Sequence, residues 1–240
     1  MPSPAVIAKS SSCLNQLVNS MTDITVYGPH WSAYTRIVRL TLIEKHLQYN
    51  LTEIDFLSGT MPDEQVKRHP FGKVPALQHS DFMLYETAAI CRYIDAAFPE
   101  PPLQPTNARL LGRMAQIISI LDTYISEPAR MGFTSELLIN PLMGVTPDTN
   151  RAQRAASSLE KAFKALCDCT TPDPFFTGKS ITLADLHAIP IFDYIDRTPG
   201  GSKLINDKAK LNQWWSKIKN RPSVVETRPD LSVFGAYSTD

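Results

Sequence analysis

The amino-acid sequence predicts a small α/β domain followed by an all-helical domain, and three observations lead to this fold class. Residues 24–98 alternate between strand and helix patterns in the order β-α-β-α-β-β-α. Residues 99–105 contain four prolines, which interrupt both periodicities and stiffen the chain where a domain boundary is expected. After these prolines only helical patterns follow. The predicted division is an N-terminal extension over 1–22, an α/β domain over 23–98, a linker over 99–107, a helical domain over 108–225 and a C-terminal tail over 226–240.

The elements of the α/β domain are predicted from the spacing of their apolar residues. Ile24–Gly28 is a β-branched and aromatic run closed by a Gly-Pro turn, which is typical of a strand. From Ser32 onward apolar residues recur at helical spacing. The charged residues expected on the outer face of this helix are Arg36, Arg39, Glu44 and Lys45. The next predicted elements are a strand over 49–56, a weak helix over 62–69, a hairpin of strands over 74–78 and 82–85, and a helix over 86–98.

Longer helical patterns make up the second half of the chain. They predict helices over 109–139 with a kink at Pro128, over 151–166, from Thr182 onward, and over 211–219. The helix at Thr182 opens with a capping box, in which the threonine hydroxyl accepts from the backbone of Asp185 and the Asp185 carboxylate reaches back. We therefore expect Asp185 to be structural and not a catalytic acid.

Composition and charge exclude several classes of function. The 24 Lys and Arg residues balance the 24 Asp and Glu residues without a long basic run, so nucleic-acid and membrane-surface partners are not expected. No apolar stretch approaches the roughly 18 residues of a membrane-spanning helix, and residues 1–22 lack the features of a signal or transit peptide. The four cysteines lack C-x-x-C spacing and the five histidines are scattered singly. We therefore expect no metal site and a reducing, cytoplasmic location.

Polar groups are expected where chain ends converge at the carboxyl edge of the small sheet. Ser32 begins the first helix, so its hydroxyl lies beside unpaired N–H groups and the positive end of the helix dipole, a place that stabilises an anion. The simpler interpretation of Ser32 is a helix cap. Phe71–Leu77 places Pro75 at the start of a strand, and Glu86 and Thr87 open another helix. If the strand order brings these turns to one edge, the resulting set of groups suits a small zwitterionic peptide.

Five sequence segments between positions 26 and 223 carry a family resemblance. They are V-Y-G-P-H-W-S-A-Y-T-R-I-V-R-L with E-K-H-L-Q-Y, H-P-F-G-K-V-P-A-L, L-Y-E-T-A-A-I-C-R-Y-I, T-L-A-D-L-H-A-I-P and W-W-S-K-I-K-N-R-P-S. On these segments the chain resembles the cytosolic glutathione transferases. The position of Ser32 before Arg36 resembles the serine-type classes, such as phi and its fungal and bacterial relatives. The resemblance implies a thioredoxin-like N-terminal domain that binds glutathione as co-substrate, a helical C-terminal domain that builds the electrophile pocket, no metal, and a homodimer.

The resemblance also implies roles for single residues. As the catalytic residue, Ser32 donates a hydrogen bond to the glutathione sulfur and so favours the thiolate. Val74 pairs its backbone N–H and C=O with the cysteinyl backbone, beside a cis-Pro75. The implied function is the activation of glutathione for conjugation to a small hydrophobic electrophile. Two alternatives stay open: a glutathione-dependent isomerase of a conjugated small molecule, and a non-catalytic interaction module of the same fold.

The γ-glutamyl end and the electrophile involve further residues by the same resemblance. Glu86 and Thr87 hold the γ-glutamyl end, although the family usually has serine where this chain has Thr87. Lys73 reaches a glycyl or peptide carboxylate. The chain departs from phi-type enzymes, in which a basic pair helps to bind the glycyl end, by having Ser58–Pro62 in that segment. The side chains expected to wall the electrophile pocket are Trp31, Tyr34, Tyr124, Met131 and Phe133.

Overall fold

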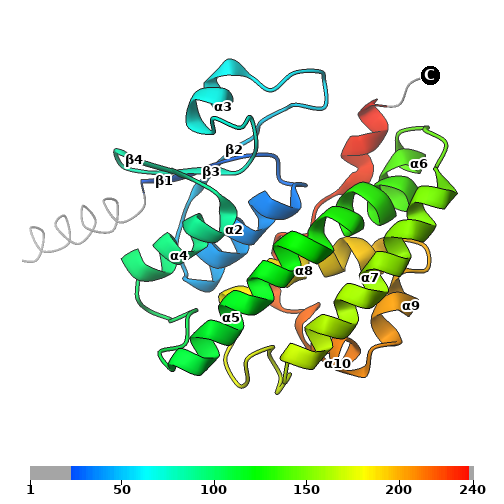
Figure 1. The fold of residues 1–240 in the computed structure, drawn as a ribbon. Helices are drawn as coiled ribbons and strands as arrows, with labels where there is room; N and C mark the ends of the chain where they lie inside the picture. The colour runs from blue at the N-terminus through cyan, green and yellow to red at the C-terminus, as the bar shows by residue number, and fades with distance from the viewer. Residues whose placement is uncertain (1–22, 238–240) are drawn as a thin grey trace, which may run out of the picture.

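The computed structural model describes residues 23–237, so the predicted extension over 1–22 and the last three residues of the tail lie outside it. A four-stranded sheet with its own helices comes first in the chain, and an array of helices follows beside it (Figure 1). The predicted fold class, a thioredoxin-like α/β domain followed by an all-helical domain, is confirmed. Within residues 23–237 no helix is both long enough and apolar enough to cross a bilayer.

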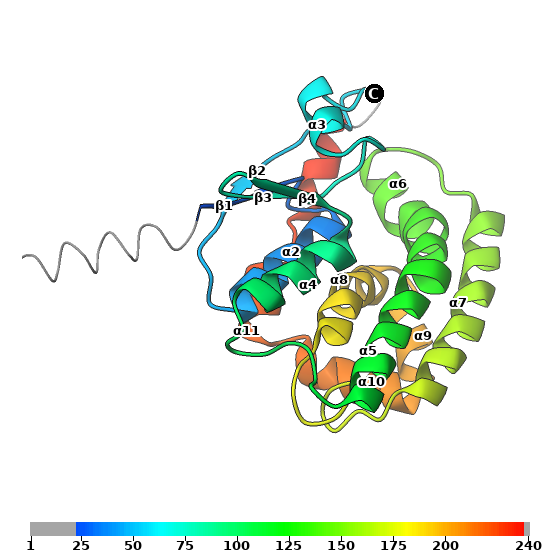
Figure 2. The same cartoon turned by 60° about the vertical axis from the view of Figure 1, so that its left-hand side comes forward.

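The sheet is mixed and has the strand order β2-β1-β3-β4. Its strands are β1 (Ile24–Tyr27), β2 (Asn50–Thr52), β3 (Ala76–His79) and β4 (Phe82–Tyr85). β1 pairs with β2 in parallel and with β3 antiparallel, and β3 pairs with β4 antiparallel. The helices α2 (Ala33–Glu44) and α4 (Thr87–Ala97) cover the face turned toward the helical domain, and α3 (Asp63–Arg68) lies on the other side (Figure 2). The predicted order β-α-β-α-β-β-α is confirmed.

Two of the strands are shorter than predicted, for local reasons. The strand predicted over 49–56 ends at Thr52, because the carboxylate of Asp55 accepts the N–H groups of Leu57 and Ser58 and turns the chain. The strand predicted over 74–78 begins only at Ala76, because Pro75 has no N–H to donate to the ladder. Both shortened strands leave irregular backbone beside the start of α2.

The helical domain contains the predicted helices together with shorter ones. Its elements are α5 (Ala108–Ile120), two π-helical segments (Leu121–Ile125 and Pro128–Ile139), α6 (Asn140–Leu142), α7 (Thr149–Cys169), α8 (Leu183–Arg197), α9 (Gly201–Asn206), α10 (Ala209–Ile218), α11 (Pro222–Glu226) and a final 3₁₀ segment (Leu231–Tyr237). The helix predicted over 109–139 changes from α to π form at Leu121, and Pro128 opens its second π-helical segment. α9, α11 and the 3₁₀ segment were not predicted, because segments of five to seven residues are too short to show a helical period.

The prediction that α2 keeps its charged residues on an outer face is wrong for three of the four. Arg36, Glu44 and Lys45 are buried, because α2 lies between its own sheet and α8 (Figure 2). The Arg36 guanidinium donates to Asp193 at 2.7 Å, and it also donates to the Thr227 hydroxyl and the Val224 carbonyl.

Glu44 and Lys45 are compensated in the same way. Arg221 donates two hydrogen bonds of 2.6 Å to the Glu44 carboxylate. The Lys45 ammonium is 2.7 Å from the Asp95 carboxylate. Because buried charges are tolerated only when they are paired, the ion pairs of Arg36 and Glu44 hold α2 against the helical domain, and the pair of Lys45 with Asp95 holds it against α4.

Candidate functional site

The start of α2 combines a helix N-terminus with a hydroxyl whose proton is not engaged. Ser32 is the N-cap residue and is only 8% exposed. Its Oγ atom accepts the N–H of Thr35 at 3.3 Å, and in residues 23–237 the hydroxyl makes no other hydrogen bond. Accepting that bond leaves the O–H proton free to be donated elsewhere. The helix dipole adds a partial positive charge at the same place, so the site favours an anion.

The loop before Ser32 is held by contacts from both domains. The hydroxyl of Tyr194 in α8 donates to the Trp31 carbonyl at 2.5 Å. The backbone N–H of His30 donates to both carboxylate oxygens of Glu53 at 3.2 Å, and the imidazole Nδ1 lies 3.1 Å from the same group. These contacts fix the position from which the Ser32 side chain projects.

The chain entering β3 presents free backbone groups. The Val74–Pro75 peptide bond is cis, and the ladder between β1 and β3 ends at the Tyr27–Ala76 pair. In the described part of the chain, neither the N–H nor the C=O of Val74 takes part in a backbone hydrogen bond. The side chain of Lys73 is exposed, and its carbonyl accepts from Gln65 at 2.9 Å. Val74 can therefore pair with an extended peptide.

The start of α4 carries backbone strain. Glu86 has φ 71° and ψ 112°, in the region that favours glycine, and such strain persists only where the surrounding structure enforces it. Its exposed carboxylate lies 3.9 Å from Nε2 of His69. Burial lowers the pKa of His69, and the Glu86 charge partly opposes that shift. Thr87 follows as the first residue of the helix and is half-buried.

The strand register brings these three turns together. Tyr27 pairs with Ala76, and Ala76 pairs with Tyr85 on its other side, so the three residues form one row across the sheet. The loop leading to Ser32, the Val74–Pro75 segment and the Glu86–Thr87 turn all leave the sheet from this row. The peptide-binding interpretation of these turns requires that they meet at one edge of the sheet, and the strand register meets that condition.

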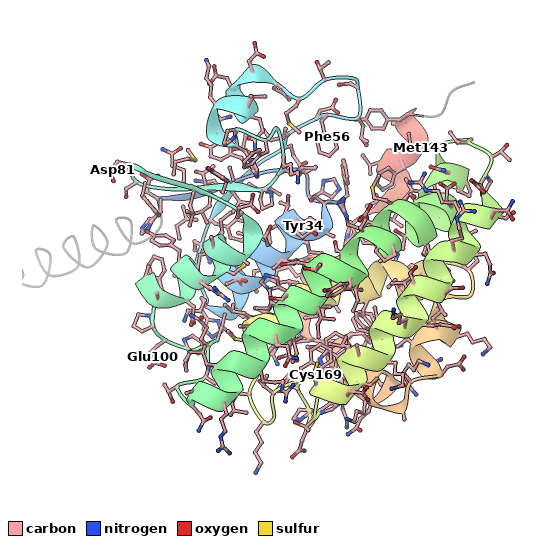
Figure 3. The ribbon with its side chains drawn as sticks, in the orientation of Figure 1. Tyr34, Phe56, Asp81, Glu100, Met143 and Cys169 are labelled. Atoms are coloured by element: carbon pink, nitrogen blue, oxygen red, sulfur yellow. The ribbon has the colours of Figure 1, made fainter. Side chains whose placement is uncertain are left out.

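Two of the five predicted pocket residues lie at the junction of the domains. Tyr34 points from α2 toward the helix that continues from α5 (Figure 3), and its hydroxyl is 2.6 Å from that of Ser126. Burial raises the pKa of Tyr34. Trp31 packs against Phe56 and Phe234, each with ring centroids 5.2 Å apart. The C-terminal 3₁₀ segment thus covers part of Trp31.

The other three pocket predictions have different surroundings. Tyr124 and Met131 are exposed, whereas Phe133 is only 4% exposed and packs in the helical core. Phe133 is therefore placed to stabilise the packing of the helices rather than to line a substrate pocket. Sequence reasoning missed Asp122, which is half-buried in the first π-helical segment. Burial raises the pKa of Asp122 to about 6, and the charge of Glu86 adds to the rise. No sequence signal marks it, because its environment arises from packing between the domains.

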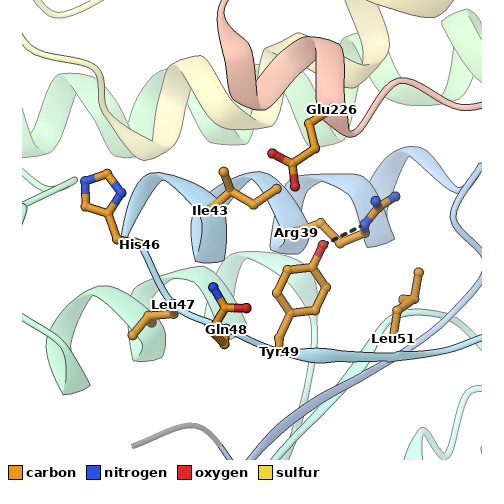
Figure 4. A pocket seen from close by; sticks show the side chains of 8 residues that line it. All are labelled: Arg39, Ile43, His46, Leu47, Gln48, Tyr49, Leu51 and Glu226. Atoms are coloured by element: carbon orange, nitrogen blue, oxygen red, sulfur yellow. Dashed lines mark hydrogen bonds between the residues drawn. The ribbon is translucent and has the colours of Figure 1, made fainter. Parts of the chain in front are cut away.

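A separate groove lies away from these residues, between the end of α2, the chain entering β2, and α11 (Figure 4). Its volume is about 550 Å³. It is lined by Arg39, Ile43, His46, Leu47, Gln48, Tyr49, Leu51 and Glu226. None of the predicted site residues lines it. Within residues 23–237, no group of three His, Cys, Asp or Glu side chains is arranged to hold a metal ion.

Comparison with known protein families decides the identity of this scaffold. The family model described as the glutathione S-transferase N-terminal domain matches residues 31–97, and the model for the C-terminal domain of the same enzymes matches residues 108–222. The chain belongs to the glutathione S-transferase family.

Individual relatives of this glutathione S-transferase chain cover almost its full described length. Glutathione S-transferase F7 of Arabidopsis thaliana is 30% identical over 206 residues, which are 85% of this chain and 98% of the relative. The probable glutathione S-transferase GSTF1 of Oryza sativa subsp. japonica is 28% identical over 220 residues, 90% of this chain and all of the relative. The crystal structure of poplar glutathione transferase F1 is 27% identical, covers 85% of this chain and 95% of its own, and superposes with a TM-score of 0.74.

These comparisons confirm the prediction of a cytosolic-type glutathione S-transferase, of a transferase enzyme and of glutathione as its co-substrate. The relatives named above belong to the F series, which agrees with the expected resemblance to the phi class.

Proposed function

We propose that Ser32 activates the glutathione thiol as a thiolate and that the enzyme transfers this sulfur to a small hydrophobic electrophile. One observation carries the proposal: the Ser32 hydroxyl has an unengaged proton at the N-terminus of α2. It lies beside the row from which Val74 and the Glu86–Thr87 turn leave the sheet. Anion stabilisation and peptide binding therefore occur at one edge.

The chemistry follows from the pKa of the thiol. A free thiol has a pKa of about 8.5, so only a few per cent is thiolate at neutral pH. The dipole of α2 and a hydrogen bond donated by Ser32 both stabilise the thiolate and lower that pKa. The thiol proton passes to solvent, and the sulfur electron pair forms a bond to the electrophilic carbon. The leaving group departs with the electrons of the bond that breaks, or, in an addition, the electron pair moves onto the acceptor.

The remaining groups at the edge bind the peptide. The Val74 N–H and C=O pair with the cysteinyl backbone of glutathione. The Thr87 hydroxyl and N–H take the γ-glutamyl carboxylate at the start of α4, and the Glu86 carboxylate faces the ammonium group. Lys73 takes the glycyl carboxylate, for which the exposed position of its side chain is suitable.

Two tyrosines near the proposed sulfur site already take part in hydrogen bonds with other side chains, which supports Ser32 as the donor. The Tyr27 hydroxyl donates to Gln78 at 2.8 Å, and the Tyr34 hydroxyl is bonded to Ser126. Neither the isomerase nor the interaction-module alternative is favoured by a specific observation at this site.

Two measurements test the proposal. The protein is expected to bind immobilised glutathione and to be eluted by free glutathione, and calorimetry should show saturable binding at millimolar concentration. An assay with 1-chloro-2,4-dinitrobenzene should show release of chloride and formation of the thioether. Absence of calorimetric binding at millimolar glutathione would reject the site and favour the interaction module.

We also propose a homodimer, in which the small domain of one subunit contacts the first long helices of the other. Exposed apolar side chains support it: Phe71, at 70% exposure, with Phe82 and Met83 on the sheet domain, and Leu110 and Leu111 on α5. Light scattering at micromolar concentration should give twice the monomer mass, and Phe71→Ser should weaken the association. A monomeric mass for the unaltered protein would contradict this.

Free buried thiols, such as that of Cys91, support the proposed cytoplasmic location, because thiols stay reduced in that compartment.

A further inference from the structure

Arg130 lies beside the proposed sulfur site without an interaction that accounts for its charge. It belongs to the second π-helical segment, and its Cζ atom lies 5.2 Å from the centroid of the Tyr34 ring. Tyr34 is in the first turn of α2, two residues after Ser32, and faces the helical domain (Figure 3). The Arg130 guanidinium therefore lies next to the helix end that we propose to hold the thiolate.

The hydrogen-bonding groups of Arg130 are largely unsatisfied. Its Nε atom is buried without an acceptor, and among residues 23–237 no other guanidinium nitrogen is in that state. Its Nη2 atom reaches only the thioether sulfur of Met131, at 3.9 Å, and a thioether is a weak acceptor. No carboxylate in the described part of the chain forms an ion pair with it. The charges of Asp122 and Glu86 raise the pKa of the neighbouring Tyr34 without a direct contact, and neither carboxylate pairs with Arg130.

Arginines at other contacts between the domains are paired. Arg36 in α2 lies 2.7 Å from the Asp193 carboxylate in α8. Arg221 lies 2.6 Å from Glu44. These arginines hold the domains together through their partners, whereas the Arg130 guanidinium beside Tyr34 has N–H donors without an acceptor. An arginine in that state fits a ligand that supplies the missing acceptors.

We infer that Arg130 binds a carboxylate carried by the electrophile, and this inference rests on the proposed function. A guanidinium presents paired N–H donors that match the two oxygens of a carboxylate. The Tyr34 ring on its face supplies a flat apolar surface next to the charge. The substrate class is therefore an aromatic or similarly planar electrophile with a carboxylate group, and Arg130 sets the specificity for that group.

The test compares 4-chloro-3,5-dinitrobenzoate with its methyl ester, which differ in charge but share the reacting carbon. The thiolate attacks the carbon that bears chlorine, the C–S bond forms, and chloride leaves with the electrons of the C–Cl bond. Arg130→Gln should raise the KM for the acid about tenfold and change the KM for the ester less than about twofold, as loss of one charge-assisted contact requires. Arg130→Lys should retain part of the preference for the acid. Arg154→Gln removes an exposed arginine from α7 and should leave both KM values unchanged.

Several results would overturn the inference. One is an equal change in the KM values for acid and ester in Arg130→Gln, and another is no change in either KM value. In both cases turnover of the ester would still support the proposed function. A raised KM for glutathione with the ester would assign Arg130 to a carboxylate of glutathione instead. If the unaltered enzyme turns over neither compound, the proposed function fails in this assay. Calorimetry with the two thioether products then repeats the comparison, and equal affinities of Arg130→Gln and the unaltered protein for the acid product would reject the role of Arg130.

Discussion

The starts of α2 and α8 are both capped by a hydroxyl residue, yet they are completed in different ways. At α8, the Asp185 carboxylate accepts four hydrogen bonds of 2.9 Å, from the N–H and hydroxyl of Thr182, the N–H of Phe176 and the indole of Trp214. At α2, the Ser32 hydroxyl accepts one bond of 3.3 Å and donates none within the described residues. The start of α8 is saturated inside the core, whereas the start of α2 retains a hydroxyl proton that is not engaged.

This difference shows that a cap residue does not by itself indicate a role. Both caps satisfy orphan N–H groups of a helix, which the sequence patterns predict equally well. What separates them is the number of partners that the rest of the fold supplies. The predicted capping box of Thr182 and Asp185 is confirmed, and its full set of partners supports the expected structural role.

The largest expected effect on the free energy of unfolding is at the start of α8, where all the donors around Asp185 are paired. Asp185→Ala removes the acceptor of four buried donors, so the free energy of unfolding should fall by about 3–5 kcal/mol, as when one partner of a buried polar network is deleted. Urea unfolding followed by circular dichroism measures this change. Asp168→Ala, on the exposed end of α7, is the control and should be nearly neutral. A loss of less than about 1 kcal/mol for Asp185→Ala would remove the contrast between the two helix starts.

Ser32→Ala should act on the chemistry more than on the fold. A charge-assisted hydrogen bond contributes roughly 1.5–3 kcal/mol, so turnover should fall about ten- to a hundredfold while glutathione affinity stays nearly intact. The pKa of bound glutathione, followed by thiolate absorbance, should rise. Loss of the cap alone would cost only about 1 kcal/mol of stability. An unchanged thiol pKa with a lowered melting temperature would make Ser32 a structural cap like Thr182.

Asp122→Asn sharpens the comparison between carboxylates. Unlike Asp185, Asp122 accepts no hydrogen bond within residues 23–237, and its pKa is raised to about 6 mainly by burial. The folded state therefore holds this proton more tightly than the unfolded chain does. The contribution of the protonated carboxyl group to the free energy of unfolding is lost as pH rises from about 4 through 6. At pH 7 the variant should be more stable by about 1–2 kcal/mol, with the gain vanishing near pH 4. Urea unfolding at both pH values checks this, and a pH-independent difference would contradict the raised pKa.

The smallest effect is expected at the start of α4. Thr87→Ser keeps the hydroxyl that we propose for the γ-glutamyl carboxylate, so the KM for glutathione should change less than about twofold. Thr87→Ala removes that hydroxyl and should raise the KM about fivefold, the value of one hydrogen bond. Steady-state kinetics at saturating electrophile separates the two variants. Equal behaviour of both would mean that the backbone of α4, and not the hydroxyl, holds the carboxylate.

Much of the fold could be predicted because its elements have strong local signals. The helical spacing after Ser32, the proline-rich break and the Thr182–Asp185 capping box all correspond to observed features. The outward placement of Arg36 and Glu44 was wrong, because their counter-charges come from Asp193 and Arg221, far along the chain. An amphipathic pattern records polarity and cannot show that a second domain supplies partners.

The candidate site could be predicted only in its backbone positions. The turns at Ser32, Val74 and Thr87 follow from strand ends, and pairing of Tyr27 with Ala76 and of Ala76 with Tyr85 aligns them. Asp122 and Arg130 could not be found, because in a π-helical stretch the residues that face the neighbouring domain no longer follow the α-helical period.

The buried contacts of Arg36 have a consequence for how substrates enter. Moving α2 away from α8 would separate the guanidinium from Asp193, Thr227 and Val224, and would leave a buried charge without compensation, at a cost of several kcal/mol. Hinge opening between the domains is therefore expected to be rare. We therefore expect substitution of residues at the junction of the domains, such as Tyr34, rather than domain movement, to change the range of electrophiles that the protein accepts.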